Sequence, residues 1–187
     1  MISARQLAGA LYGVWLLYRF DVRAWELFDK SAKGFWGAYI VAVFLAPLQI
    51  AHAILQYDAD KQTLTFIPYV IVQLLSYVVT WTLFPFVMLY IAHLLNRAPR
   101  YFAYMVPYIW MQMPIGLALF SVQVLTDVHV LPATALEVVS PAVLIAFAVY
   151  GTFVAGLGLQ IATGTAFGLV VLDYVLGLIA DNLITRI

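Results

Sequence analysis

Asp173 is the residue with the clearest potential for chemistry, because it lies near the middle of the last predicted membrane span, residues 166–183. An ionisable group at that depth is costly unless it faces protein, water or a partner. We therefore consider Asp173 a candidate proton or cation site, or a contact for a partner subunit. Two structural alternatives stay open: a protonated Asp173 hydrogen-bonded to a neighbouring helix, or a shifted last helix that places Asp173 at a shallower depth.

Glutamines form the second group of polar side chains inside apolar stretches. Gln73, Gln112, Gln123 and Gln160 are spread over three of the predicted spans. Together with Asp173 they could line a polar path, and we take Asp173, Gln73, Gln112 and Gln160 as the candidate intramembrane polar site. Hydrogen bonding between helices is the structural alternative for these amides.

The sequence offers no residue set for catalysis or for a metal. It has no cysteine, and its histidines, His52, His93 and His129, lack the spacing of zinc or haem ligands. No serine or threonine has an adjacent base, and glycine-rich phosphate loops are missing. We therefore expect no catalytic residue, no metal and no cofactor, and we predict that the protein is not an enzyme. An intramembrane enzyme acting on lipid is the weakest of the functions considered.

Composition places the chain in a lipid bilayer. Its 187 residues are 65% apolar and 10% charged, whereas ordinary soluble domains are roughly 45–50% apolar and about 25% charged. Barrel strands would alternate polar and apolar residues, which this sequence does not do, so we predict an all-α integral membrane protein. The formal net charge is zero, which argues against a nucleic-acid partner.

The charge-free run of residues 66–95 organises the predicted fold. At about 1.5 Å per residue it is longer than the roughly 30 Å hydrocarbon core. Residues 1–30 have apolar positions at helical spacing, but their apolar run, residues 7–18, is too short to cross. We therefore predict an amphipathic interfacial helix there, with a re-entrant helix as the alternative. Residues 31–187 are predicted to form one domain of five transmembrane helices, at about 35–56, 66–95, 101–125, 140–161 and 166–183.

Caps and prolines predict where the helices begin and bend. Asp21 is expected to cap a short turn after the first helix, and Ser31 to cap the first span. Pro47 should kink that span and leave a carbonyl for Gln49 or a neighbouring helix to satisfy. Pro107 and Pro114 predict that the third span is bent or partly unwound.

Basic residues predict how the chain is threaded. Arg97 and Arg100 directly follow the second span, and Lys30 and Lys33 precede the first. By the positive-inside rule these four residues set a cytoplasmic side that includes the amino terminus, and five spans then put the carboxyl terminus outside. We expect a bacterial inner membrane.

Glycines crowd the last two spans, which a linker of only residues 162–165 makes an antiparallel hairpin. Gly164 and Gly168 have the small-xxx-small spacing of closely packed helices, and Gly156 and Gly158 are likewise read as packing positions.

Several segments resemble the Yip1-domain superfamily. They are Phe35-Trp36 at the start of the first span, the second span with its basic turn, residues 100–104 leading to Pro114, residues 150–158, and residues 163–168. The resemblance covers roughly residues 34–183. It implies a cytoplasmic amino-terminal segment, five spans, and a non-enzymatic protein that binds other proteins or shapes the bilayer.

Two functions from different classes follow. The first is a membrane scaffold or accessory subunit that packs against another membrane protein or a second copy of itself. The alternative is a transporter or channel for a small solute or ion that uses Asp173 and the intramembrane glutamines. Asp173→Asn separates them, since it should leave a scaffold's assembly nearly intact and abolish ion-coupled flux.

Overall fold

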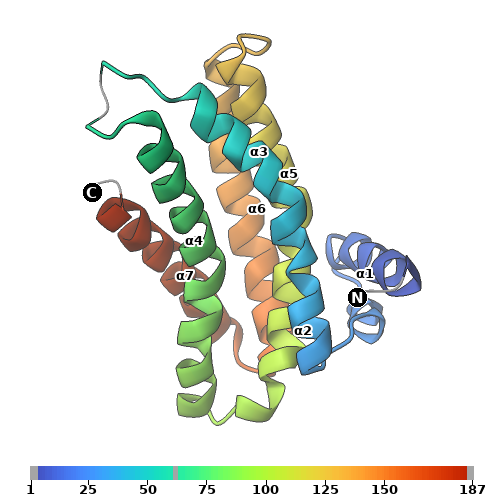
Figure 1. Ribbon diagram of the computed structural model, residues 1–187. Helices are drawn as coiled ribbons and strands as arrows, with labels where there is room; N and C mark the ends of the chain where they lie inside the picture. Colours follow the sequence, from blue (N-terminus) through green and yellow to red (C-terminus); the bar gives the residue numbers. More distant parts are fainter. Residues whose placement is uncertain (1–3, 61–62, 185–187) are drawn as a thin grey trace.

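The computed structural model describes residues 4–60 and 63–184, and every regular element in these ranges is a helix. In chain order the elements are α1 (Ala4–Leu17), the 3-10 helix η1 (Val22–Leu27), α2 (Ala32–Ala38), α3 (Ile40–Leu55), α4 (Phe66–Leu94), the 3-10 helix η2 (Ala98–Arg100), α5 (Tyr101–Asp127), α6 (Thr134–Leu159) and α7 (Thr163–Ile184). Figure 1 shows α3, α5 and α6 running alongside one another, with α7 passing obliquely behind α4 and α1 lying outside the bundle next to α2.

Five helical segments of the described chain are long and apolar enough to cross a membrane, which confirms the predicted all-α class with five helices of spanning length. They are Ala32–Leu55, Phe66–Leu94, Ala98–Asp127, Thr134–Leu159 and Thr163–Leu183. Each overlaps one predicted span. The amino-terminal apolar helix is shorter, Gln6–Leu17, as predicted for a segment that does not cross.

The boundaries differ from the sequence prediction in three places. The first span is interrupted at Tyr39, which ends α2 and begins α3. The fourth helix begins at Thr134 instead of near residue 140. Glu137 lies in its first turn, where the helix dipole stabilises a carboxylate. The last linker is shorter than expected, because Gln160 closes α6 in the left-handed conformation and α7 already begins at Thr163.

Both predicted caps are confirmed. The Asp21 carboxylate accepts a hydrogen bond from the Arg23 backbone N–H at 2.9 Å, and the Ser31 hydroxyl accepts one from Gly34 at 3.1 Å. These bonds satisfy backbone donors that the first helical turn leaves without intrahelical partners.

Tyrosines from neighbouring elements bond to backbone carbonyls near the helix-interior prolines. Pro85 lacks an N–H, which frees the carbonyl of Trp81 four residues earlier, and Tyr39 donates to it at 3.3 Å. Tyr77 of α4 donates to the carbonyl of Ala42 in α3 over 2.6 Å. The carbonyl that Pro47 leaves without an intrahelical donor is that of Val43, one residue further along, so the expectation that a neighbouring helix satisfies it stays a prediction.

The third span stays continuous through its two prolines, so the partly unwound alternative is wrong. Tyr18 donates to the carbonyl of Met111, three residues before Pro114, at 2.8 Å. This bond ties the end of α1 to α5 at the point where the proline weakens the helix.

The core is centred on the first half of α5. Every residue from Tyr104 to Met111 is buried there, and α5 packs against α6, α3, α2 and α1. The second half of α5 is only partly buried. The bundle is therefore tightly packed at one end and looser at the other.

The four residues predicted to set the topology share the tightly packed end. α2 begins there, next to Lys30 and Lys33, and the turn holding Arg97 and Arg100 lies at the same end because α4 runs the opposite way (Figure 1). Arg100 also has a structural role, since its Nε donates to the carbonyl of Gly158 at 2.8 Å. A cation at the end of α6 also suits the helix dipole.

The glycines predicted to pack divide into two pairs. A Cβ at Gly158 would lie 2.7 Å from the Cα of Tyr104, so α6 and α5 meet there with no room for a side chain, whereas Gly156 has only ordinary contacts at 3.9 Å. A Cβ at Gly164 or Gly168 would meet nothing within 4 Å. The prediction that Gly164 and Gly168 pack is therefore wrong for contacts within this chain, because their face of α7 points away from the bundle.

Candidate functional site: an acidic cavity between the spans

A cavity of about 470 Å³ opens where the second half of α5 separates from its neighbours. Its polar lining residues are Thr80, Tyr108, Gln112, Asp173, Tyr174 and Asp181. Helices α4, α5, α6 and α7 contribute most of its wall, and α3 contributes one leucine. The cavity therefore lies among the segments that are apolar enough to span a membrane.

Asp173 and Tyr108 form the polar centre of this cavity. The Tyr108 hydroxyl donates to Asp173 Oδ2 over 2.6 Å, which joins α5 to α7. Among the described residues, Tyr108 is the one side chain that hydrogen-bonds Asp173. The carboxylate can accept about four hydrogen bonds, so most of its capacity is left for a ligand or water in the cavity.

The lining has acidic charge and aromatic walls. Asp173 and Asp181 are its charged members, and none of the described residues that line it is Lys or Arg. Aromatic rings of Trp81, Phe120 and Phe147 form part of the wall, beside aliphatic side chains. Carboxylates next to aromatic faces favour a cation, and aromatic rings favour an organic one.

The structure brings together two of the four residues predicted as a polar site. Gln112 lines the same cavity as Asp173, one helical turn beyond Tyr108. Gln73 lies elsewhere, in a small recess between α3 and α4 that also contains Gln49 and Tyr77. Gln160 is exposed as the C-cap of α6. The polar site is therefore a cavity in one part of the bundle, without a polar path through all the spans.

A second buried carboxylate lies at the opposite end of the bundle from the basic residues. Asp127 Oδ2 is 2.6 Å from His52 Nδ1, and its Oδ1 accepts a hydrogen bond from Gln56 at 2.7 Å. The Asp127 side chain is only 4% exposed. We refer to His52, Gln56 and Asp127 as the polar clasp. It connects the end of α3 to the end of α5.

Sequence reasoning missed Tyr108 and the polar clasp because their partners are 65 and 75 residues apart. One signal for the clasp was available. His52 ends the first predicted span and Asp127 ends the third, and alternating spans bring these two ends to the same side. No comparable signal existed for Tyr108, one of many tyrosines in its segment.

Electrostatics outside the spans centre on the turn after α1. The Arg23 side chain hydrogen-bonds to Asp21, and this lowers the pKa of Asp21 to about 2 and raises the pKa of Arg23. Burial raises the pKa of Tyr18 above its ordinary value, and the neighbouring Tyr150 adds to the effect. The turn is therefore held by an ion pair next to a neutral buried phenol.

Within residues 4–60 and 63–184 no three or more His, Cys, Asp or Glu side chains gather in a way that could hold a metal ion. Comparison with protein-family models, with curated proteins and with solved structures gave no match to this chain. The resemblance to the Yip1-domain superfamily accordingly stays a prediction from the sequence.

Proposed function

We propose that this protein binds a small organic cation in the acidic cavity and conducts it across the membrane, with Asp173 as the counter-ion. The observation that carries the proposal is the Asp173–Tyr108 pair within an aromatic cavity whose charged lining residues are carboxylates. A cation would replace water at the free lone pairs of the carboxylate, and the rings would stabilise its positive charge.

Three residues that line the cavity have distinct parts in this function. Tyr108 holds the Asp173 carboxylate toward the cavity. Gln112 supplies an amide that can donate or accept a hydrogen bond, which selects a polar cation over an apolar one. Asp181, further along α7, raises the local concentration of cations near the binding position.

Calorimetric binding of benzylamine, which is protonated at neutral pH, and of neutral benzyl alcohol tests the proposal with the protein in nanodiscs. We expect benzylamine to bind and benzyl alcohol to bind at least about tenfold more weakly, because a desolvated charge pair is worth more than a kilocalorie. Asp173→Asn should remove this preference, whereas Glu137→Gln, an exposed carboxylate on α6, should retain it.

Electrical measurement then separates binding from transport. Liposomes that contain the protein should give a benzylamine-dependent current on a solid-supported membrane, and Asp173→Asn should abolish it. Equal binding of the amine and the alcohol would contradict the proposed cation site. If benzylamine bound but gave no current, the protein would be a receptor for the cation and not a transporter.

A scaffold or accessory subunit is the second candidate, and the open face of α7 favours it. Gly164 and Gly168 are exposed, and small residues at this spacing let a helix of another membrane protein, or of a second copy, approach closely. Gly168→Leu should then reduce co-purification of a stoichiometric partner in mild detergent while the melting temperature stays the same. The Yip1-like resemblance agrees with this candidate.

We also propose that the basic end of the bundle faces the cytoplasm of a bacterial inner membrane, with α1 lying in the adjacent leaflet. Lys30, Lys33, Arg97 and Arg100 support this sidedness. A cysteine placed at exposed Arg97 should be protected from an impermeant maleimide in whole cells, and one placed at exposed Asp60 should react.

A further inference from the structure

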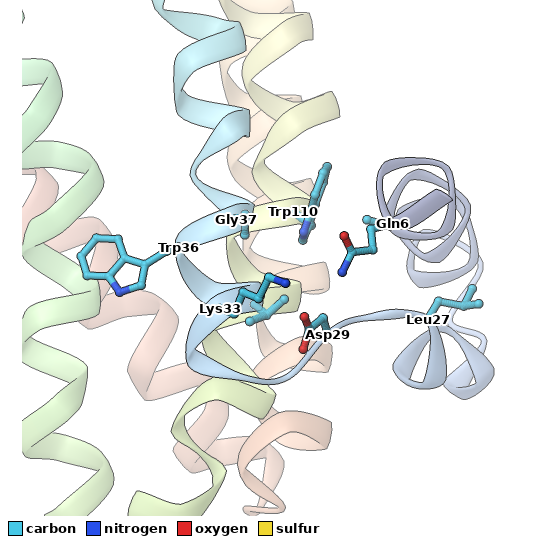
Figure 2. Close-up of a pocket in the computed structure, with 11 residues that line it drawn as sticks. Gln6, Leu27, Asp29, Lys33, Trp36, Gly37 and Trp110 are labelled. Carbon is cyan, nitrogen blue, oxygen red and sulfur yellow. The ribbon is translucent and has the colours of Figure 1, made fainter. Parts of the chain in front are cut away.

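A second large cavity, of about 480 Å³, lies under α1 and shares no lining residue with the acidic cavity. It is bounded by α1, the segment that leads into α2, α2 itself and α5. Figure 2 shows Gln6, Asp29, Lys33 and Trp110 facing the gap between α1 and α2, whereas Trp36 points away on the far side of α2. We call this space the α1 cavity.

The outer surface of α1 indicates that lipid surrounds this cavity. Leu7, Leu11, Tyr12 and Trp15 are between 39% and 54% exposed, while the opposite face of α1 packs into the core. A helix that is apolar on its open face and too short to cross lies in the interface, at the boundary of headgroups and acyl chains. With α1 in the leaflet position proposed above, the α1 cavity, at the start of the first span, opens at headgroup depth.

Two opposite charges stand at the rim of this cavity without neutralising each other. The ion pairs of the described residues are Arg23–Asp21 and His52–Asp127, so Asp29 and Lys33 are not paired with each other. Asp29 is held in place by the Ser31 backbone N–H, which donates to its Oδ1 at 3.3 Å. A ligand with both a phosphate and an ammonium group would complement this rim.

The remaining wall suits the rest of a lipid molecule. Ala10, Leu27, Ala38 and Val106 supply apolar surface for the glycerol and acyl portions. Trp110 and Gln6 supply N–H donors beside the charged rim (Figure 2). An indole at headgroup depth is also the usual position for tryptophan in membrane proteins.

We infer that the α1 cavity binds one phosphatidylethanolamine molecule, whose phosphate contacts Lys33 and whose primary ammonium contacts Asp29. Phosphatidylcholine is disfavoured because its methylated nitrogen cannot donate a hydrogen bond to Asp29. Phosphatidylglycerol is disfavoured because it has no cation to offset the carboxylate. This lipid site is independent of the cation proposed at Asp173.

Native mass spectrometry of the whole protein tests the inference, with the three lipids present at equal concentration and with identical acyl chains. We expect one dominant phosphatidylethanolamine adduct, at least about tenfold above either competitor, because charge-assisted hydrogen bonds are strong. This preference of the unaltered protein is a sufficient test by itself. Retention of phosphatidylcholine or phosphatidylglycerol at the same level would overturn the inference.

Two variants assign the contacts. Lys33→Gln should lower retention of all three lipids about tenfold, whereas Arg97→Gln, an exposed basic residue at the same end of the bundle, should not. Asp29→Asn keeps the oxygen that accepts from Ser31 and should reduce phosphatidylethanolamine to the level of phosphatidylcholine, with exposed Glu26→Gln as its control.

The source of the ligand is tested by adding free O-phosphoethanolamine. It should not displace the lipid, because the apolar wall contributes nothing to its binding. If O-phosphoethanolamine displaced the lipid at equal concentration, the natural ligand would be a water-soluble molecule, which would contradict a lipid site. Melting temperatures without added lipid show whether each variant is folded, and a Lys33→Gln variant that is folded and keeps the full lipid preference would refute the role of Lys33.

Discussion

The two ends of the bundle are held together in different ways. At the basic end, α5 and α6 meet backbone to backbone at Gly158 and Tyr104, and Arg100 bonds the last turn of α6. Further along the bundle α4, α5, α6 and α7 surround the acidic cavity, and at the opposite end the polar clasp of His52, Gln56 and Asp127 ties α3 to α5. Dispersion forces and close approach therefore stabilise one end, and a few strong polar contacts the other.

The carboxylates of Asp127 and Asp173 show what this difference means for function. Asp127 has protein partners on both oxygens and is nearly inaccessible, so its bonding capacity is used for structure. Asp173 has Tyr108 alone among the described residues and lines a cavity. A buried carboxylate whose partners are all protein groups is a structural element, and one with capacity left over is a candidate for binding.

The largest stability effect is expected at the polar clasp. His52→Leu should lower the free energy of unfolding by about 2–3 kcal/mol, because it leaves the Asp127 carboxylate buried with one partner fewer. His93→Leu removes an exposed histidine of α4 and should change stability by less than about 0.5 kcal/mol. Unfolding in mixed micelles measures the stability of both variants. If the two substitutions changed the free energy of unfolding equally, the polar clasp would contribute nothing to stability.

A somewhat smaller effect is expected at the tightly packed end. Gly158→Ala should destabilise the protein by about 2 kcal/mol, because the new methyl group meets the backbone of Tyr104 and that contact can be relieved only if the helices separate. Gly164→Ala adds the same group where nothing lies within 4 Å, and the gain in helix propensity should stabilise the chain by up to about 1 kcal/mol.

The same pair of variants also tests the scaffold candidate. If Gly164→Ala destabilises the protein in detergent while Gly158→Ala does not, the packing at the two glycines is the reverse of that described. If Gly164→Ala stabilises the isolated chain but weakens association with a second chain, the open face of α7 is a contact surface.

The sequence predicted the spans better than it predicted the site, for a physical reason. Charge-free length and flanking charges locate helices in lipid. They do not specify which face of each helix points inward, because lipid tails are as apolar as the protein core. Gln73 and Asp173 both lie in helices long enough to span, as predicted, but of the predicted glutamines only Gln112 shares the cavity with Asp173.

Glycine spacing was ambiguous for the same reason. Gly158 and Gly164 were both predicted to be packing positions, yet a Cβ at Gly158 would meet a neighbouring backbone and one at Gly164 would meet nothing within 4 Å. The Tyr39 break was also invisible in the sequence, since no proline or glycine occupies that position. Rotation of helices and contacts far apart in the chain require the structure.

A small effect on stability is expected at Asp173. Asp173→Asn keeps an oxygen that accepts the Tyr108 hydroxyl, and the cavity leaves space for water, so the free energy of unfolding should change by less than about 1 kcal/mol. The corresponding Asp127→Asn should cost more, because it weakens two contacts in a closed environment. If Asp173→Asn and Asp127→Asn lowered the free energy of unfolding equally, both carboxylates would have a structural role.

The smallest effect is expected outside both ends of the bundle, at the turn after α1. The lowered pKa of Asp21 means that its ionised form stabilises the folded turn. This stabilisation is fully present above the ordinary pKa of about 3.8 and is lost as the pH falls through about 2. Hydrogen exchange of residues 22–27, corrected for intrinsic rates, should therefore show protection that decreases over this range, whereas in Asp21→Asn it should be nearly constant. If protection from hydrogen exchange decreased in parallel at the polar clasp, α1 and the far end of the bundle would unfold together. The two regions would then not be independent.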